Sequence, residues 1–142
     1  MPILSITEIG YLAGIIDGEG CIAIRWTGRS NACFVVLTVA NTCAPLVFWL
    51  HDRLGGSVHL HGRLADRPKR KPIWQWHASA GVVVPVLRLV LPHLIVKRRQ
   101  AALVLEYARF ENPGLRAVPQ EEVERRRGIV DECRRLNKRG VA

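Results

Sequence analysis

Apolar residues recur at helical spacing in the first segment of the chain. They are Ile6, Ile9, Leu12, Ala13 and Ile16, and together they form one face of a helix. Ser5-Ile6-Thr7-Glu8 has the sequence of a capping box, with serine at the N-cap and glutamate three residues later. The pattern predicts a helix that begins after Ser5 and ends at the glycines of Asp17-Gly18-Glu19-Gly20.

The following segments alternate apolar and polar residues, which is typical of half-buried strands. This alternation predicts strands at about residues 21–27, 32–40, 58–63 and 74–78. The apolar positions expected to face the helices are Ile22, Ile24 and Trp26, then Val35, Leu37 and Val39, then Val58 and Leu60, and finally Trp74, Trp76 and Ala78. Between the second and third strands we expect a helix capped by Thr42, with Pro45 in its first turn and Gly55-Gly56 at its end.

Helical spacing returns in the second half of the chain, at about residues 82–91, 97–110 and 119–136. The order of elements is therefore helix, strand, strand, helix, strand, strand, helix, followed by further helices. Because hairpins joined by helices bury one side of a sheet, this order predicts an α+β fold. We expect an antiparallel four-stranded sheet with helices on one face, formed as a single domain by residues 1–142.

The chain is strongly basic, with 21 Lys and Arg against 12 Asp and Glu and a formal net charge of +9. This balance predicts a polyanionic partner, and a solvated basic surface is the alternative. No apolar run is long enough to predict a membrane span. The segment from Met1 to Glu8 lacks the features of a signal peptide. We therefore expect a protein of the cytoplasm or another interior compartment of the host cell, neither secreted nor bound to a membrane.

No acidic residue lies on the polar sides of the four predicted strands. They carry Arg25, Thr27, Thr38, His59, His61, Arg63, Gln75 and His77. Such side chains are suited to base edges, so this face predicts contact with DNA; a merely solvated face is the alternative. Zinc binding by the two histidines of the third strand is a further alternative, but no third ligand lies near them in the sequence. The turn residue Arg29 is also expected to contact DNA, and the loop residues Lys69, Arg70 and Lys71 are expected to contact flanking phosphates.

The first predicted helix ends in the most distinctive segment of the chain. Residues 12–20 read L-A-G-I-I-D-G-E-G, which resembles the LAGLIDADG motif of homing endonucleases. The departures are Ile15, Gly18 and Glu19, and the glutamate keeps the carboxylate of the aspartate that it replaces. The similarity also covers the order of the predicted elements, the helix end at residues 54–56, and residues 91–100 and 136–140. It therefore spans nearly the whole chain.

The resemblance implies the αββαββα homing endonuclease fold and a site-specific enzyme that makes double-strand breaks in DNA. Such an enzyme would hydrolyse phosphodiester bonds with Mg²⁺, or with another divalent cation such as Mn²⁺. Glu19 then matches the essential metal ligand, and Gly18 offers a carbonyl oxygen to the same ion. Asp17 is either a further metal ligand or a residue that stabilises the motif turn.

Two other residues match positions near the family's active site. Lys97 matches a catalytic lysine that polarises water or stabilises developing charge, with Arg98 and Arg99 as rivals. An ordinary charge at a helix start is the alternative for this lysine. Asn41 matches a polar residue that orients water, and it could instead belong to the cap of the following helix.

The chain contains a single copy of the motif, whereas cutting both strands of a duplex takes two active sites. A homodimer acting on a long, roughly palindromic target is therefore expected. Gly10, Ala13 and Gly14, beside Asp17, would let two motif helices pack closely. The alternatives are a nucleic-acid-binding module without cleavage, such as an intron RNA maturase or a DNA-binding regulator, and a protein that binds an acidic protein partner.

Overall fold

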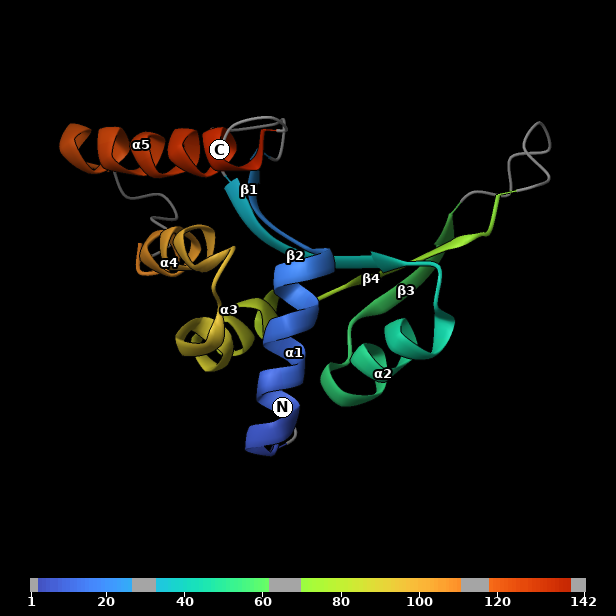
Figure 1. Cartoon of the computed structure of the whole chain (residues 1–142). Helices are drawn as coiled ribbons and strands as arrows, with labels where there is room; N and C mark the ends of the chain where they lie inside the picture. Colours follow the sequence, from blue (N-terminus) through green and yellow to red (C-terminus); the bar gives the residue numbers. More distant parts are fainter. Residues whose placement is uncertain (1–2, 27–32, 62–69, 111–117, 139–142) are drawn as a thin grey trace.

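The computed structural model describes residues 3–26, 33–61, 70–110 and 118–138 (Figure 1). The predicted order of helices and strands is confirmed, to within a few residues at each boundary. The elements are α1 (Ile6–Glu19), β1 (Gly20–Trp26), β2 (Cys33–Asn41), α2 (Ala44–Leu54), β3 (Ser57–His61), β4 (Ile73–His77), α3 (Ala80–Val90), the short 3-10 helix η1 (Leu91–His93), α4 (Arg98–Tyr107) and α5 (Gln120–Asn137).

The four strands form one antiparallel sheet in the order β1-β2-β4-β3. Figure 1 shows α1, α2 and α3 on the same side of this sheet, while α5 packs against α4 and β1 at one end. The α+β fold with helices on one face is therefore confirmed. Because the strands pair in register, the predicted apolar positions form rows across the sheet; Val39 pairs with Trp76, which in turn pairs with Val58.

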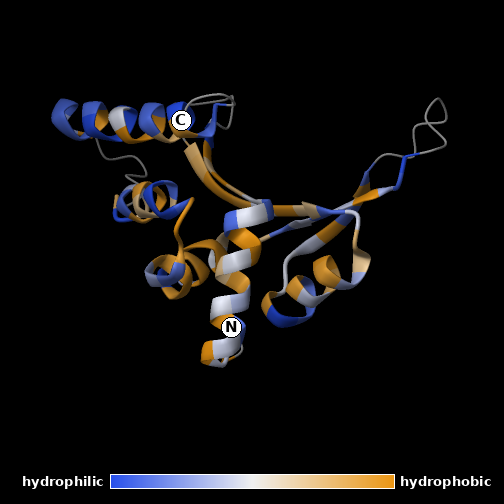
Figure 2. Ribbon diagram, viewed as in Figure 1, coloured by the Kyte–Doolittle hydropathy of each residue, from blue (hydrophilic) through white to orange (hydrophobic). Residues whose placement is uncertain are grey.

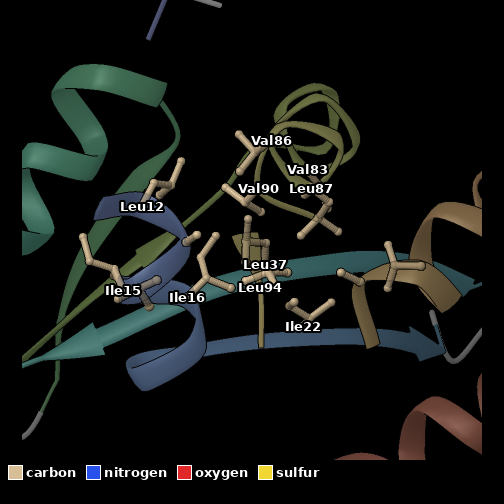
Figure 3. Packing of buried hydrophobic residues seen from close by; sticks show 14 of the residues in the cluster. Leu12, Ile15, Ile16, Ile22, Leu37, Val83, Val86, Leu87, Val90 and Leu94 are labelled. Atoms are coloured by element: carbon tan, nitrogen blue, oxygen red, sulfur yellow. The ribbon is translucent and has the colours of Figure 1, made fainter. Parts of the chain in front are cut away.

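The first helix forms as its sequence predicts. The Ser5 hydroxyl accepts the Glu8 N–H, and the Glu8 carboxylate accepts the Ser5 N–H at 2.8 Å, which completes the capping box. Leu12 and Ile16 are fully buried between the sheet and α3 (Figure 3). Complete burial of such a side chain contributes about 1.5–3 kcal/mol, so these contacts fix α1 on the sheet.

The second helix begins differently from the prediction. Its N-cap is Cys43, and the Asn41 side-chain oxygen accepts the Cys43 N–H at 2.8 Å. The expected Thr42 cap is wrong, because this asparagine makes the turn into the helix with its own side chain. The predicted end at the paired glycines is confirmed, and both have positive φ. Only glycine fits at Gly56, where a Cβ would lie 2.3 Å from the carbonyl oxygen of His77.

Burial decreases toward the far ends of the strands. Leu60 lies on the helix side of β3 yet is 43% exposed, since α2 does not cover that part of the sheet (Figure 1). The predicted direction of Leu60 is therefore confirmed, but the side chain is not buried there. At the opposite end Trp26 is half-buried, with the guanidinium carbon of Arg134 5.9 Å from its ring centroid.

The last helix protects the open edge of β1. The Asn137 side-chain amide donates to the carbonyl oxygen of Ile22 at 2.8 Å, so a backbone group of this edge strand is satisfied by α5. Figure 2 shows that α5 is mostly hydrophilic, in contrast to α3. Among the helices within the described ranges, none combines the length and apolar character that crossing a bilayer requires.

Candidate nucleic-acid interface and acidic turn

The last turn of α1 is joined to a loop from the second half of the chain. One carboxylate oxygen of Asp17 accepts the Ile95 N–H at 2.7 Å, and the other accepts the Lys97 N–H at 3.0 Å. Partial burial raises the pKa of Asp17, but these amides, that of Val96 and the charge of Lys97 outweigh it and hold the pKa below its usual value. Asp17 is therefore ionised at neutral pH, with both oxygens engaged.

The ammonium group of Lys97 points to the same turn. Its Nζ donates to the main-chain carbonyl oxygen of Asp17 at 2.6 Å. The rival cations point elsewhere. Arg98 donates to the carbonyl oxygens of Leu94 and Pro92, and Arg99 pairs with Glu132. Of these three cations, Lys97 is the one that the structure brings to the motif turn.

The two other predicted residues of this turn are exposed. Glu19 makes no hydrogen bond or ion pair within the described part of the chain, and it directly precedes β1. Gly18 lies in the last turn of α1, where main-chain carbonyl groups have no N–H partner within the helix. A free carboxylate and a helix-end carbonyl are hard oxygen donors of the kind that Mg²⁺ prefers. No three His, Cys, Asp or Glu side chains of the described residues group together as a metal site.

Asn41 lies at the end of β2, on the same side of the strand as Val39, which is the helix side. Its side-chain oxygen is used by the Cys43 N–H. This geometry favours the alternative that Asn41 belongs to the entry of the following helix, and does not support a role in orienting water.

The polar face of the sheet carries most of the predicted DNA contacts that fall within the described residues. Arg25, His59 and His61 are exposed, Gln75 and His77 are half-buried, and Arg70 and Lys71 are exposed beyond β3.

Thr38 is on this face but only 6% exposed, which is a correction: its neighbours in the sheet cover it, so it is not free to contact a base. Four predicted contacts, Thr27, Arg29, Arg63 and Lys69, lie outside the described residues.

Two apolar side chains also lie on this face and were missed by the sequence reasoning. Phe34 is 48% exposed and pairs with Arg25, while Ile73 is 44% exposed and pairs with His61. The same alternation that placed Val35 on the helix side could have placed Phe34 opposite to it. Apolar groups on such a face are suited to contact with thymine methyl groups.

Three histidines gather on β3 and β4. The ring centroid of His59 lies 5.3 Å from that of His77 and 6.4 Å from that of His61, and the Ser57 hydroxyl is 3.1 Å from His59 Nε2. Partial burial lowers the pKa of His77, and so do the nearby His59, His61 and Arg25. His77 is therefore mainly neutral at physiological pH. The described part of this face has no acidic side chain that would favour the charged form of its ring.

One exposed side of α1 carries three glycines and an aromatic residue. Gly10, Gly14 and Gly18 are exposed at a spacing of four residues, with Tyr11 52% exposed beside them. We call these four residues the α1 stripe. Ala13, which the sequence analysis placed in the interface, is only 2% exposed and belongs to the core of the chain itself, which corrects that assignment. A Cβ on any glycine of the stripe would meet nothing within 4 Å, so the fold of one chain does not require these glycines.

A scan against protein-family models found no match, and a search among curated proteins found none either. Solved structures, in contrast, match over most of the chain. The homing endonuclease I-CvuI, in complex with its target in the presence of 2 mM Ca, is 22% identical with a TM-score of 0.73, covering 96% of this chain and 86% of that one. The archaeal intron-encoded homing endonuclease I-Vdi141I, complexed with DNA, is 15% identical with a TM-score of 0.73, covering 95% and 87%.

The LAGLIDADG meganuclease I-AabMI, bound to uncleaved DNA, matches less extensively. It is 18% identical with a TM-score of 0.55, and the match covers 86% of this chain and 43% of that one. All three structures share the arrangement of helices and sheet described above. The resemblance drawn from residues 12–20 is thus confirmed at the level of architecture, and the chain has the LAGLIDADG homing endonuclease fold.

Proposed function

We propose that the chain is a site-specific endonuclease that cuts both strands of a DNA duplex, acting as a homodimer with Mg²⁺ or a similar divalent cation. The observation that carries this proposal is the end of α1, where the unpartnered carboxylate of Glu19 and the ammonium of Lys97 share one turn. This turn opens directly into β1, whose sheet has a polar face without an acid in its described part. The fold supports the same function, because I-Vdi141I has it and is described as complexed with DNA.

The end of α1 suits a hard cation. Glu19 would supply a carboxylate oxygen and Gly18 a carbonyl oxygen. When bound, the cation would lower the pKa of a coordinated water and neutralise charge on the phosphate. We infer that oxygens of a bound DNA phosphate, and not further side chains, would complete the set at each of the two turns.

Lys97 has the position of a charge stabiliser. Hydrolysis forms a bond from a water oxygen to phosphorus and breaks the bond to the sugar oxygen that leaves. The Lys97 ammonium, fixed on the Asp17 carbonyl, would stabilise the negative charge that develops on the phosphate oxygens. Asp17 and Asn41 have their side-chain oxygens engaged by backbone N–H groups, so neither is assigned a step in the hydrolysis.

The α1 stripe supports a dimer. A glycine within a helix costs roughly 0.8–1 kcal/mol relative to alanine, and the fold of one chain gains no packing from these three. Glycines at this spacing allow two helix backbones to approach closely, and their steric effect holds outside membranes as well. Two chains paired by this stripe would bring two Glu19 turns together, one for each DNA strand.

A randomised duplex library tests the proposed function. With the protein and Mg²⁺, cut fragments should converge on one long, pseudo-palindromic sequence with both strands broken, and a chelator should abolish cutting. Selection of bound duplexes that are never cut, with either Mg²⁺ or Mn²⁺, would contradict the nuclease and leave a DNA-binding module. Failure to select any sequence would contradict DNA recognition as well.

DNA affinity is expected to rise as the pH falls from about 7.5 to 6. The free protein holds the pKa of His77 low, mainly through partial burial, whereas nearby phosphates favour the charged ring. The pKa of His77 is therefore expected to be higher in the DNA complex than in the free protein. DNA binding then strengthens as the pH falls through the pKa of the complex, and the gain in affinity is complete below the pKa of the free protein. Titration of a fluorescent target duplex at several pH values and salt concentrations measures this, with a steeper salt dependence expected at low pH.

The matched control replaces His59, His61 and His77 together with glutamine, which keeps hydrogen-bonding groups but cannot be charged. This variant should bind with an affinity that changes little over the same pH range. Affinity of the original chain that does not respond to pH, or an unchanged response in the triple variant, would contradict the assignment of this cluster to the DNA interface.

A further inference from the structure

The loop that precedes α4 begins at the buried Leu94, but its next residues are held by hydrogen bonds and not by burial of their side chains. Ile95 is 86% exposed and Val96 69% exposed, although both are apolar. Their backbone is fixed instead by Asp17, whose two carboxylate oxygens accept the N–H groups of Ile95 and Lys97 at 2.7 and 3.0 Å. These residues lie 78 and 80 positions from Asp17 in the sequence, so the bonds are long-range tertiary contacts and not a local helix cap. We call this set of hydrogen bonds between Asp17 and the loop the tie.

The tie has a third contact, which runs in the opposite direction. Lys97 Nζ donates to the main-chain oxygen of Asp17 at 2.6 Å, so the same two residues are joined at the amide and at the ammonium group. A lysine side chain is long and flexible, and ordering it normally costs conformational entropy. Because both ends of Lys97 bind one residue, its ammonium group is held at the main-chain oxygen of Asp17, in the turn that also contains Gly18 and Glu19.

We propose that Asp17 is a positioning residue that acts through Lys97, and not a ligand of the metal. This inference rests on the proposed function, because it assigns the role of a residue in the same site. A carboxylate that already accepts two backbone N–H groups would have to give up those bonds, and the order of the loop with them, to bind a cation. Asp17 and Glu19 therefore have different roles although the motif places them two residues apart.

Cleavage kinetics of Asp17→Asn test this assignment. Asparagine has the same size, but its amide group can accept only one of the two N–H groups. We expect the single-turnover cleavage rate to fall by about 10²-fold, as is typical when a catalytic group is misplaced, with the affinity for the target duplex unchanged. A second variant, Asp17→Ser, serves if the asparagine variant does not fold.

The matched control is Arg98→Ala, which removes two hydrogen bonds from the preceding segment, to Leu94 and Pro92, without touching Lys97. It should lower the melting temperature and leave the cleavage rate nearly unchanged at a temperature where it is folded. Equal losses of cleavage in the two variants would mean that Asp17 only stabilises the fold, and would overturn the positioning role.

A double-mutant cycle with Lys97→Met separates positioning from metal binding. If Asp17 acts through Lys97, adding Asp17→Asn to Lys97→Met should lower the cleavage rate by less than about threefold further. Multiplied losses would show an independent role, as expected for a metal ligand, and would overturn the inference. The apparent Mg²⁺ concentration for half-maximal cleavage should also stay the same in Asp17→Asn.

A readout without DNA keeps this test separate from the test of the proposed function. Amide hydrogen exchange at Ile95 and Lys97 should be slow in the original chain and at least tenfold faster in Asp17→Asn, with core amides unaffected. Unchanged exchange at these two amides would overturn the tie itself. If the original chain cuts no DNA while the exchange result is as expected, the proposed function fails and the tie stands.

Discussion

Replacing Glu19 with glutamine is expected to abolish DNA cleavage while leaving specific DNA binding intact. Glutamine keeps the length and the hydrogen-bonding capacity of the side chain but removes the charge that a divalent cation requires. Several kcal/mol of transition-state stabilisation would be lost, and at about 1.4 kcal/mol per tenfold the cleavage rate should fall roughly 10³-fold or more. Single-turnover cleavage of a selected target, measured beside a binding titration of the same duplex, gives both numbers.

The fold should tolerate this substitution, because Glu19 is exposed and makes no hydrogen bond or ion pair within the described residues. Its melting temperature should match that of the original chain, which is the control for misfolding. Lys97→Met serves as a second comparison, with a smaller loss expected, since the cation and its ligands would remain. A Glu19→Gln chain that still cuts at a comparable rate would contradict the assignment of the essential carboxylate.

Replacing Gly14 with leucine is expected to separate the dimer and to remove double-strand cleavage. Leucine favours a helix, and nothing within 4 Å obstructs a Cβ at this position in one chain, so the monomer should stay folded. Overpacking costs about 1–3 kcal/mol, and a twofold interface contains the substitution twice. At about 1.4 kcal/mol per tenfold, the dimer dissociation constant should rise roughly 30-fold or more.

Sedimentation over a range of concentrations, with and without target DNA, measures this change. The matched control is Gly128→Leu, in the exposed part of α5, where a Cβ also meets nothing within 4 Å but which lies outside the α1 stripe. This control should stay dimeric and active. A Gly14→Leu chain that sediments as a dimer and cuts both strands would exclude the stripe as the interface.

The fold could largely be predicted because its signals are local. The capping box at Ser5 and Glu8 marks the start of α1, and the paired glycines at 55 and 56 mark the end of α2; both depend on hydrogen bonds or φ angles of adjacent residues. The two-residue alternation predicted which side chains of each strand face the helices, and the pairing register places those side chains on the same side of the sheet. Leu60 shows the limit of this reasoning, since alternation gives a direction but not the length of the helix that covers it.

The site could be predicted only in part, because its contacts join distant segments. The motif predicted that Asp17 and Glu19 would stand in one turn, and the resemblance singled out Lys97. The bond between Lys97 Nζ and the Asp17 carbonyl spans 80 residues, and no periodicity carries it. Ala13 illustrates the same point from the other side: it is small and lies next to Gly14, yet it packs inward, because only the rotation of the helix on its sheet decides which small residues remain exposed.

The most direct test of the proposed mechanism uses a dimer with one inactive site. Differently tagged copies of the original chain and of Glu19→Gln can be produced together, and the mixed dimer purified by both tags in turn. If each chain supplies one carboxylate turn and cuts one strand, the mixed dimer should nick a single strand of each target duplex, and denaturing electrophoresis of strand-labelled DNA should show nicks in either strand. Double-strand breaks by the mixed dimer, or no cut in either strand, would contradict the account.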